Sequence, residues 1–253
     1  MSGDINAHVD ALTSTKGLGD LNKLPRELRD MIYESMLAQT LDQNVDVEDY
    51  LSRPNRDLPS ILKISRTIRE EIVLVALHKR NLIVQDHRTM RQFTSSLERF
   101  SANKGFASVQ TLELRAFNNI RCTFSMLSLH ATQVKRFPAL RHLGFSFDAH
   151  TLVAIDPTTS APSPAFLADL VQNDIFKELF ACTTLRCLTL EARDCVYGLY
   201  LTFGASKALQ YLGSWLEEEF EKRKMEVKVQ IVETYTPRYG PRREMSVWGG
   251  RGK

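Results

Sequence analysis

The sequence predicts an α/β protein, with α+β as the related alternative: an N-terminal helical module, then irregular helix–strand units with largely parallel strands. Two early segments place apolar residues at helical spacing. Residues 86–234 then alternate four times between an amphipathic segment and a short apolar strand. With 253 residues, 43% of them hydrophobic and 25% charged, the chain can bury a core without disulfides or metal.

Composition divides the chain into four parts: a disordered leader (1–20), a helical module (21–85), a helix–strand region packed with it (86–234) and a basic disordered tail (235–253). The tail holds five basic residues against Glu244, and no apolar period for packing. Removing these from the 33 basic and 30 acidic residues leaves a body of net charge −1. Because broad phosphate-binding surfaces need many cations, the body is not expected to bind nucleic acid.

The module 21–85 contains two predicted helices. Pro25 suits the first turn of the first helix, where its missing N–H costs nothing. An apolar stripe with a four-residue period follows this helix: Leu24, Leu28, Ile32 and Met36. Ser60 is placed to cap the second helix, which runs to about Leu77. Its apolar residues are Ile61, Ile64, Ile68, Ile72 and Val75.

The segments around these helices have other signals. The stretch 41–59 is acidic and contains two prolines, so it predicts a loop. A short buried strand is expected over Asn81–Gln85. The four helix–strand units pair 89–100 with 109–115, 122–137 with 140–147, 164–180 with 185–192, and 205–224 with 225–234. The Pro/Ser/Thr-rich insertion Asp148–Pro164 predicts an exposed loop.

Three of the strands share one local pattern, an aliphatic residue followed three and five residues later by further apolar residues. The matching sets are Val109, Leu112 and Leu114; Leu140, Leu143 and Phe145; and Leu185, Leu188 and Leu190. This pattern resembles the strand segment of a leucine-rich repeat. Two architectures stay open: an irregular leucine-rich-repeat-like arc, and an ordinary layered αβ sheet. In both, Leu112, Leu143 and Leu188 point into one core, and Glu113 and Thr189 point away from it.

Signatures of catalysis and of metal or cofactor binding are missing from the sequence. It has no G-x-S-x-G, G-x-x-x-x-G-K-[ST], G-x-G-x-x-G or H-E-x-x-H motif. The four cysteines form no C-x-x-C pair and predict small buried thiols. We therefore expect no enzyme activity, no cofactor and no metal. The chain shows no membrane-spanning run and no secretory signal, which favours the cytoplasm or nucleus.

Two motifs in the module resemble a known family. The first is Leu24-Pro25-x-Glu27-Leu28-Arg29-x-x-Ile32-Tyr33, and the second is Ile64-Ser65-Arg66-x-Ile68-Arg69-x-Glu71. Together they are similar to the F-box-like domain abundant in filamentous fungi, over about a third of the chain. The resemblance implies an adaptor-binding helix that lies in a hydrophobic groove of a ubiquitin-ligase adaptor. The partner-binding residues would be Leu24, Pro25, Leu28, Ile32 and Met36.

The alternative for this stripe is packing inside the protein, because an amphipathic helix can bury its apolar face against its own chain as well as against a partner. We interpret the chain as an intracellular protein–protein interaction protein, an F-box-type adaptor that recruits an unknown target to a ubiquitin ligase. The first rival is a stand-alone scaffold or binding module without a ligase link. The second is an RNA-associating protein that uses its Arg-rich tail.

Overall fold

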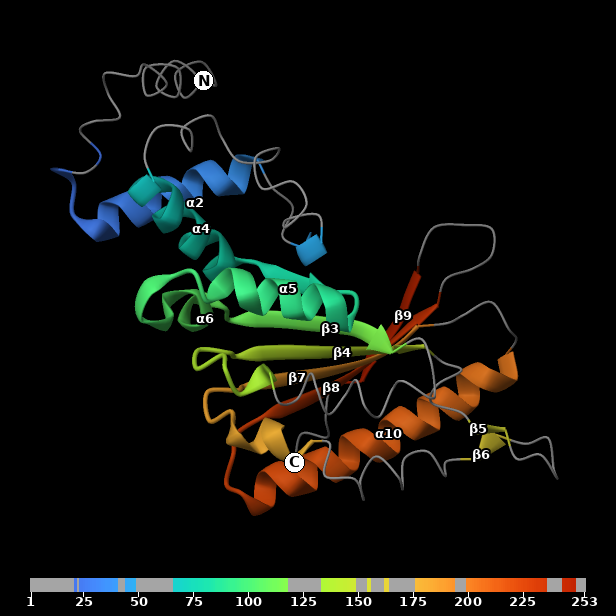
Figure 1. Cartoon of the computed structure of the whole chain (residues 1–253). Helices are drawn as coiled ribbons and strands as arrows, with labels where there is room; N and C mark the ends of the chain where they lie inside the picture. The colour runs from blue at the N-terminus through green and yellow to red at the C-terminus, as the bar shows by residue number, and fades with distance from the viewer. Residues whose placement is uncertain are drawn as a thin grey trace, which may run out of the picture.

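The computed structural model describes residues 21, 23–40, 44–48, 66–117, 133–148, 154–155, 162–163, 176–193, 199–235 and 243–248. The expected leader, the Ser60 cap, two of the cysteines and most of the predicted helices 122–137 and 164–180 lie outside these residues. Figure 1 shows the chain from end to end.

The described helices are α2 (Arg26–Thr40), α4 (Arg66–Lys79), α5 (His87–Leu97), α6 (Lys104–Ser108) and α10 (Leu199–Lys222), with 3₁₀ turns at Ser101–Asn103 and Lys177–Ala181. The strands are β1 (Asn44–Asp46), β2 (Asn81–Val84), β3 (Thr111–Phe117), β4 (His142–Asp148), β5 (Ala154–Ile155), β6 (Pro162–Ser163), β7 (Cys187–Arg193), β8 (Lys228–Tyr235) and β9 (Arg243–Trp248). The helices and the sheet confirm the predicted α/β fold class.

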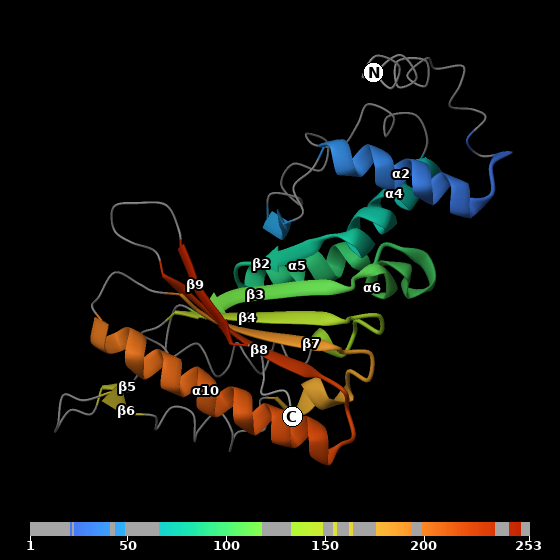
Figure 2. The same ribbon diagram turned by 180° about the vertical axis from the view of Figure 1, so that it is seen from behind.

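The main sheet follows chain order. Its strands run β1-β2-β3-β4-β7-β8-β9, and neighbours are parallel except for the last pair, which is antiparallel. Parallel crossovers are almost always right-handed, so connections between strands in simple chain order return on the same face of the sheet. Figure 2 shows α10 alongside β8. Both architectures left open by the sequence predict parallel neighbouring strands, and the sheet has them from β1 to β8.

The core lies between the sheet and its helices. The predicted inward residues Leu112, Leu143 and Leu188 pair in register across β3, β4 and β7, and each is at most 1% exposed. They belong to one apolar cluster with residues of the covering helices: Met90, Phe93 and Leu97 from α5, Phe106 from α6, and Leu209, Leu212, Leu216 and Phe220 from α10. The expectation that these three leucines line one continuous core is confirmed.

A repeated turn leads into each of these three strands. The backbone N–H of Leu140 donates to the carbonyl oxygen of Phe137 at 3.2 Å, and that of Leu185 donates to Cys182 at 3.0 Å. The same bond joins Val109 to Phe106 at 3.4 Å. The first aliphatic residue of the pattern therefore closes a tight turn, and an apolar residue three positions earlier is buried beneath it.

The helical module packs on the sheet region through α4. A second apolar cluster joins α2 and α4, and it contains Tyr33, Leu37, Ile68, Ile72, Val75 and Ala76. Leu77, at the end of α4, belongs instead to the main core. The module is thus fixed to the sheet region by a helix that contributes to both clusters (Figure 1).

Some of the strands differ from the sequence-based expectations. β1 adds a parallel edge strand inside the predicted loop 41–59, since Val45 pairs with Leu82. β5 and β6 form a small antiparallel pair within the predicted loop 148–164. β9 lies within the segment predicted to be a disordered tail, and it pairs with β8. That tail prediction is wrong for Arg243–Trp248, because an edge strand needs only backbone partners and short alternation.

Candidate functional site

A carboxylate at the centre of the α2–α4 interface decides how α2 is oriented. Glu71 of α4 accepts hydrogen bonds from Arg29 of α2, from Nε at 3.0 Å and from Nη2 at 2.7 Å. The Tyr33 hydroxyl donates to the same carboxylate at 3.0 Å, and Arg26 forms an ion pair with it at 2.7 Å. Arg29 also donates to the carbonyl oxygen of Leu24 at 2.7 Å, which ties down the start of α2.

The charges in this cluster stabilise one another. Burial would raise the pKa of Glu71, but the hydrogen bonds from Arg29 and Tyr33 and the charge of Arg26 outweigh it and lower that pKa. Burial and the bond to Glu71 raise the pKa of Tyr33 to about 12. Arg29, Tyr33 and Glu71 are all residues that carry the F-box-like resemblance. Here they hold two helices together, which is a structural role.

This cluster fixes which residues of the predicted stripe reach the surface. The face of α2 that contacts α4 carries Tyr33 and Leu37, whereas Leu28 is 46% exposed and Pro25 is exposed. The other residues of the stripe, Leu24, Ile32 and Met36, are half-buried. Leu28 therefore does not pack in the core, whereas Leu24, Ile32 and Met36 are partly covered by the protein itself. Met31, which lies beside the stripe on α2, is 65% exposed.

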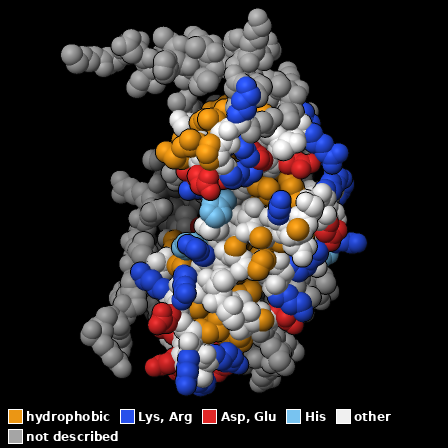
Figure 3. Space-filling view, turned by 90° about the vertical axis from the view of Figure 1, so that its left-hand side faces the viewer, with side chains coloured by type: hydrophobic (Ala, Val, Ile, Leu, Met, Phe, Trp, Pro, Cys, Tyr) orange, Lys and Arg blue, Asp and Glu red, His pale blue; other side chains and the backbone are white. Residues whose placement is uncertain are grey.

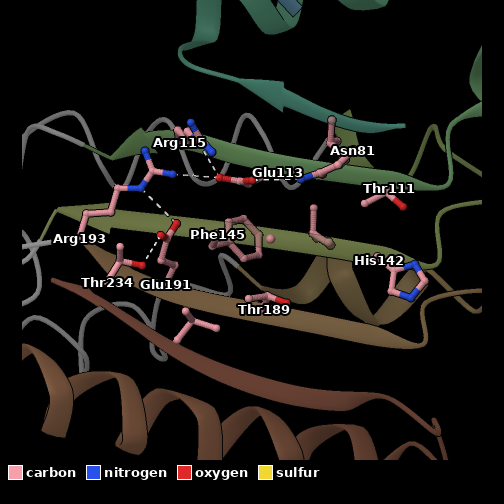
Figure 4. A pocket seen from close by; sticks show the side chains of 14 residues that line it. Asn81, Thr111, Glu113, Arg115, His142, Phe145, Thr189, Glu191, Arg193 and Thr234 are labelled. Atoms are coloured by element: carbon pink, nitrogen blue, oxygen red, sulfur yellow. Dashed lines mark hydrogen bonds and ion pairs between the residues drawn. The ribbon is translucent and has the colours of Figure 1, made fainter. Parts of the chain in front are cut away.

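A second candidate surface lies on the face of the sheet opposite the main core. A hollow of about 600 Å³ spans β2, β3, β4, β7 and β8 at this face, and we call it the sheet hollow. Its polar lining includes Asn81, Thr111, Glu113, Arg115, His142, Thr189, Glu191, Arg193 and Thr234. Figure 4 shows these side chains projecting from neighbouring strands into one space.

Gly144 forms part of the lining of this hollow. Because it has no side chain, β4 leaves space above its backbone at this position. A Cβ atom at this position would lie 3.2 Å from Cγ of Glu113, closer than side chains normally approach. The register places Gly144 between Glu113 of β3 and Thr189 of β7. The hollow is therefore shaped by the absence of a side chain on β4 between two strands that carry longer ones.

An ion network crosses the hollow. Glu113 accepts from Arg193 Nη2 at 3.1 Å and from Asn81 Nδ2 at 3.2 Å, and it also pairs with Arg115. Arg193 Nε donates to Glu191 at 3.1 Å (Figure 4). The expectation that Glu113 points away from the core is confirmed. It does not stand free in solvent, however, because its side chain is only 17% exposed and joins residues up to 80 positions away.

Glu191 is held as an anion by its neighbours. Burial would raise its pKa, but the Thr234 hydroxyl, which donates at 2.7 Å, and the charge of Arg193 lower it below the ordinary value. Glu191 is thus charged at neutral pH, and it keeps the Arg193 side chain in place. One signal for this network is visible in the sequence, namely the polar residues that recur at the outward strand positions.

Other predicted sites have structural roles where they are described. Arg66 pairs with Glu70 one turn along α4, on the solvent side. Cys182 is buried, and burial raises the pKa of its thiol to about 11, so it packs as a small apolar group. Within the described ranges no three His, Cys, Asp or Glu side chains gather as metal ligands. Nor does any described helix have the length and apolarity to cross a membrane.

Comparison with protein-family models, with curated proteins and with solved structures finds no match for this chain.

Proposed function

We propose that this chain is an intracellular, non-enzymatic protein–protein interaction protein that docks a ubiquitin-ligase adaptor through α2. The observation that carries the proposal is the orientation of α2. Its polar side is anchored to Glu71, and its apolar residues Leu28 and Met31 remain 46% and 65% exposed. Exposed large apolar side chains on a rigid helix are what a partner with a hydrophobic groove recognises.

The resemblance supports the nature of that partner. Leu24, Pro25, Leu28 and Ile32 match the F-box-like motif, and F-box helices bind their adaptor with these apolar positions. The anchoring residues Arg29 and Tyr33 also match, although they act inside the protein. In this scheme the sheet hollow, on the face of the sheet opposite the main core, is available to hold a target.

The test is copurification with an adaptor. Leu28→Asp places a charge on the exposed face, so the variant should keep its thermal midpoint and lose the adaptor and its ligase subunits. Tyr211→Asp is the matched control, because Tyr211 is 58% exposed on α10 and lies outside the motif. It should keep the adaptor. A folded Leu28→Asp variant that binds the adaptor as well as the wild type would refute the proposal.

The charge distribution supports a protein partner over a nucleic acid. Figure 3 views the end of the molecule where the parallel strands begin, and Lys and Arg side chains there alternate with Asp and Glu. Ion pairs among the described residues include Lys135 with Glu178 at 3.2 Å and Arg136 with Glu98 at 2.7 Å. A phosphate backbone favours a continuous cationic surface, which this end does not offer.

A stand-alone binding module remains the second candidate, and it would use the sheet hollow without an adaptor. The copurification test separates this module from a ligase adaptor protein, because a stand-alone module would copurify with a target and without ligase subunits. RNA association through residues 235–253 would instead give a salt-sensitive shift of an RNA oligonucleotide that disappears when these residues are removed.

A further inference from the structure

We propose that the sheet hollow binds a carboxylate group of an acidic peptide segment in the recruited target, and that Arg115 and Arg193 are its anchors. This inference rests on the proposed function, since it names the chemistry of the target that the interaction protein would hold. It depends on a different surface from α2, so the two can fail separately.

Hydrogen-bond capacity in the hollow is unbalanced toward donors. A guanidinium group has five N–H donors. Bonds to the described residues use one donor of Arg115, its Nε, and two of Arg193, its Nε and Nη2. Both oxygens of Glu113 and both of Glu191 already accept a bond. Among the described residues, most N–H donors of Arg115 and Arg193 therefore have no acceptor, and a carboxylate is the best match for paired guanidinium groups.

The two guanidinium groups are fixed and reachable. Both bond the same oxygen of Glu113, so they lie side by side at one end of the hollow, opposite His142 (Figure 4). The side chain of Arg115 is 20% exposed and that of Arg193 is 30% exposed. Because their positions are set before a ligand arrives, little side-chain entropy is lost on binding.

The remainder of the hollow suits a peptide. The space beside Gly144 is bordered by the hydroxyl groups of Thr111 and Thr189, which can donate to or accept from backbone amides. The volume of about 600 Å³ admits a few residues of an extended chain.

The experiment is selection of random dodecapeptides displayed on phage against the full chain, followed by fluorescence anisotropy with the selected peptides. We expect selected sequences to be enriched in Asp, Glu or a free C-terminal carboxylate. Replacing that carboxylate by its amide should weaken binding at least tenfold. Arg193→Gln and Arg115→Gln should each cause a similar loss, and Gly144→Val should block binding by filling the hollow.

Arg186→Gln is the matched control, because Arg186 is exposed at the start of β7 and pairs with Glu226 at 3.9 Å, outside the hollow. It should leave peptide affinity unchanged. If Arg193→Gln lowers the thermal midpoint, Arg193→Lys keeps the charge with fewer donors and should still weaken binding several-fold.

Selection without acidic enrichment, or acidic peptides that bind equally to wild type and the folded Arg115→Gln variant, would overturn the inference. So would tighter binding of a single-stranded RNA oligonucleotide at the same site. Leu28→Asp should retain peptide binding. A wild-type chain that binds the peptide but copurifies no adaptor would contradict only the proposed function, and one that copurifies the adaptor but selects no acidic peptide would contradict only this inference.

Discussion

Glu71 and Arg29, 42 positions apart in the chain, form a two-pronged ion pair that joins α4 to α2. The pair lies on the side of α2 away from Leu28, and it fixes which residues of the helix face the protein. The same contact therefore supports the fold and presents the apolar surface that we assign to the adaptor.

The first prediction concerns this pair. Glu71→Ala leaves the fully buried hydroxyl of Tyr33 without its acceptor and Arg29 without its counterion. We expect the free energy of unfolding to fall by about 2–3 kcal/mol. Urea denaturation measures the change. Glu70→Ala, on the exposed side of the same helix, is the control and should stay within about 0.5 kcal/mol. Equal effects of the two changes would contradict a central role for Glu71.

The second prediction is the pH dependence of this contribution. The pKa of Glu71 is lowered in the folded state, so its charge stabilises the protein above the unfolded pKa of about 4.3. That stabilisation is lost as the pH falls through the lower folded pKa. The difference in unfolding free energy between wild type and Glu71→Gln should be constant above about pH 5 and shrink below about pH 4. A difference that grows on acidification would show that the sign is wrong.

Sequence periodicity predicted the buried positions of the strands, because the same type of residue recurs at the same point of each strand. Leu112, Leu143 and Leu188 could be aligned in advance, because every repeat buries an aliphatic residue at the same point of the strand. The orientation of α2 could not be predicted. Its stripe and its opposite face are both partly apolar, and the contact that chooses between them, Arg29 with Glu71, depends on pairing across the chain.

The sheet hollow could not be predicted from the sequence either. Its network joins Glu113 to Arg193, and that pairing follows only from the order and register of the strands. The outward direction of Glu113 followed from strand alternation, but its partners did not. β9 was missed for a different reason. The surrounding arginines and glycines outweighed the alternation of polar and apolar residues from Glu244 to Val247.

The third prediction compares the two faces of the sheet. Leu112→Ala, Leu143→Ala and Leu188→Ala should each lower the free energy of unfolding by about 2–5 kcal/mol, because each leaves a cavity in the same core. Thr189→Ala, on the hollow side, should cost about 0.5 kcal/mol or less. Denaturant melts of these variants decide the matter. Similar costs for Thr189 and Leu188 would mean that both faces are packed as core.

The last prediction concerns β9. Truncation after Thr236 removes the strand that pairs with Val232 and Glu233 of β8, and it leaves that edge of the sheet with unpaired backbone groups. Since each net hydrogen bond contributes about 1 kcal/mol, we expect the thermal midpoint to fall by about 5 °C. Scanning calorimetry compares two truncated chains. One ends after Tyr235 and lacks β9, and the other ends after Trp248 and keeps it. Removing only residues 249–253 should leave the midpoint unchanged, because the strand is kept. If both truncations melt at the wild-type temperature, β9 does not contribute to the stability of the sheet.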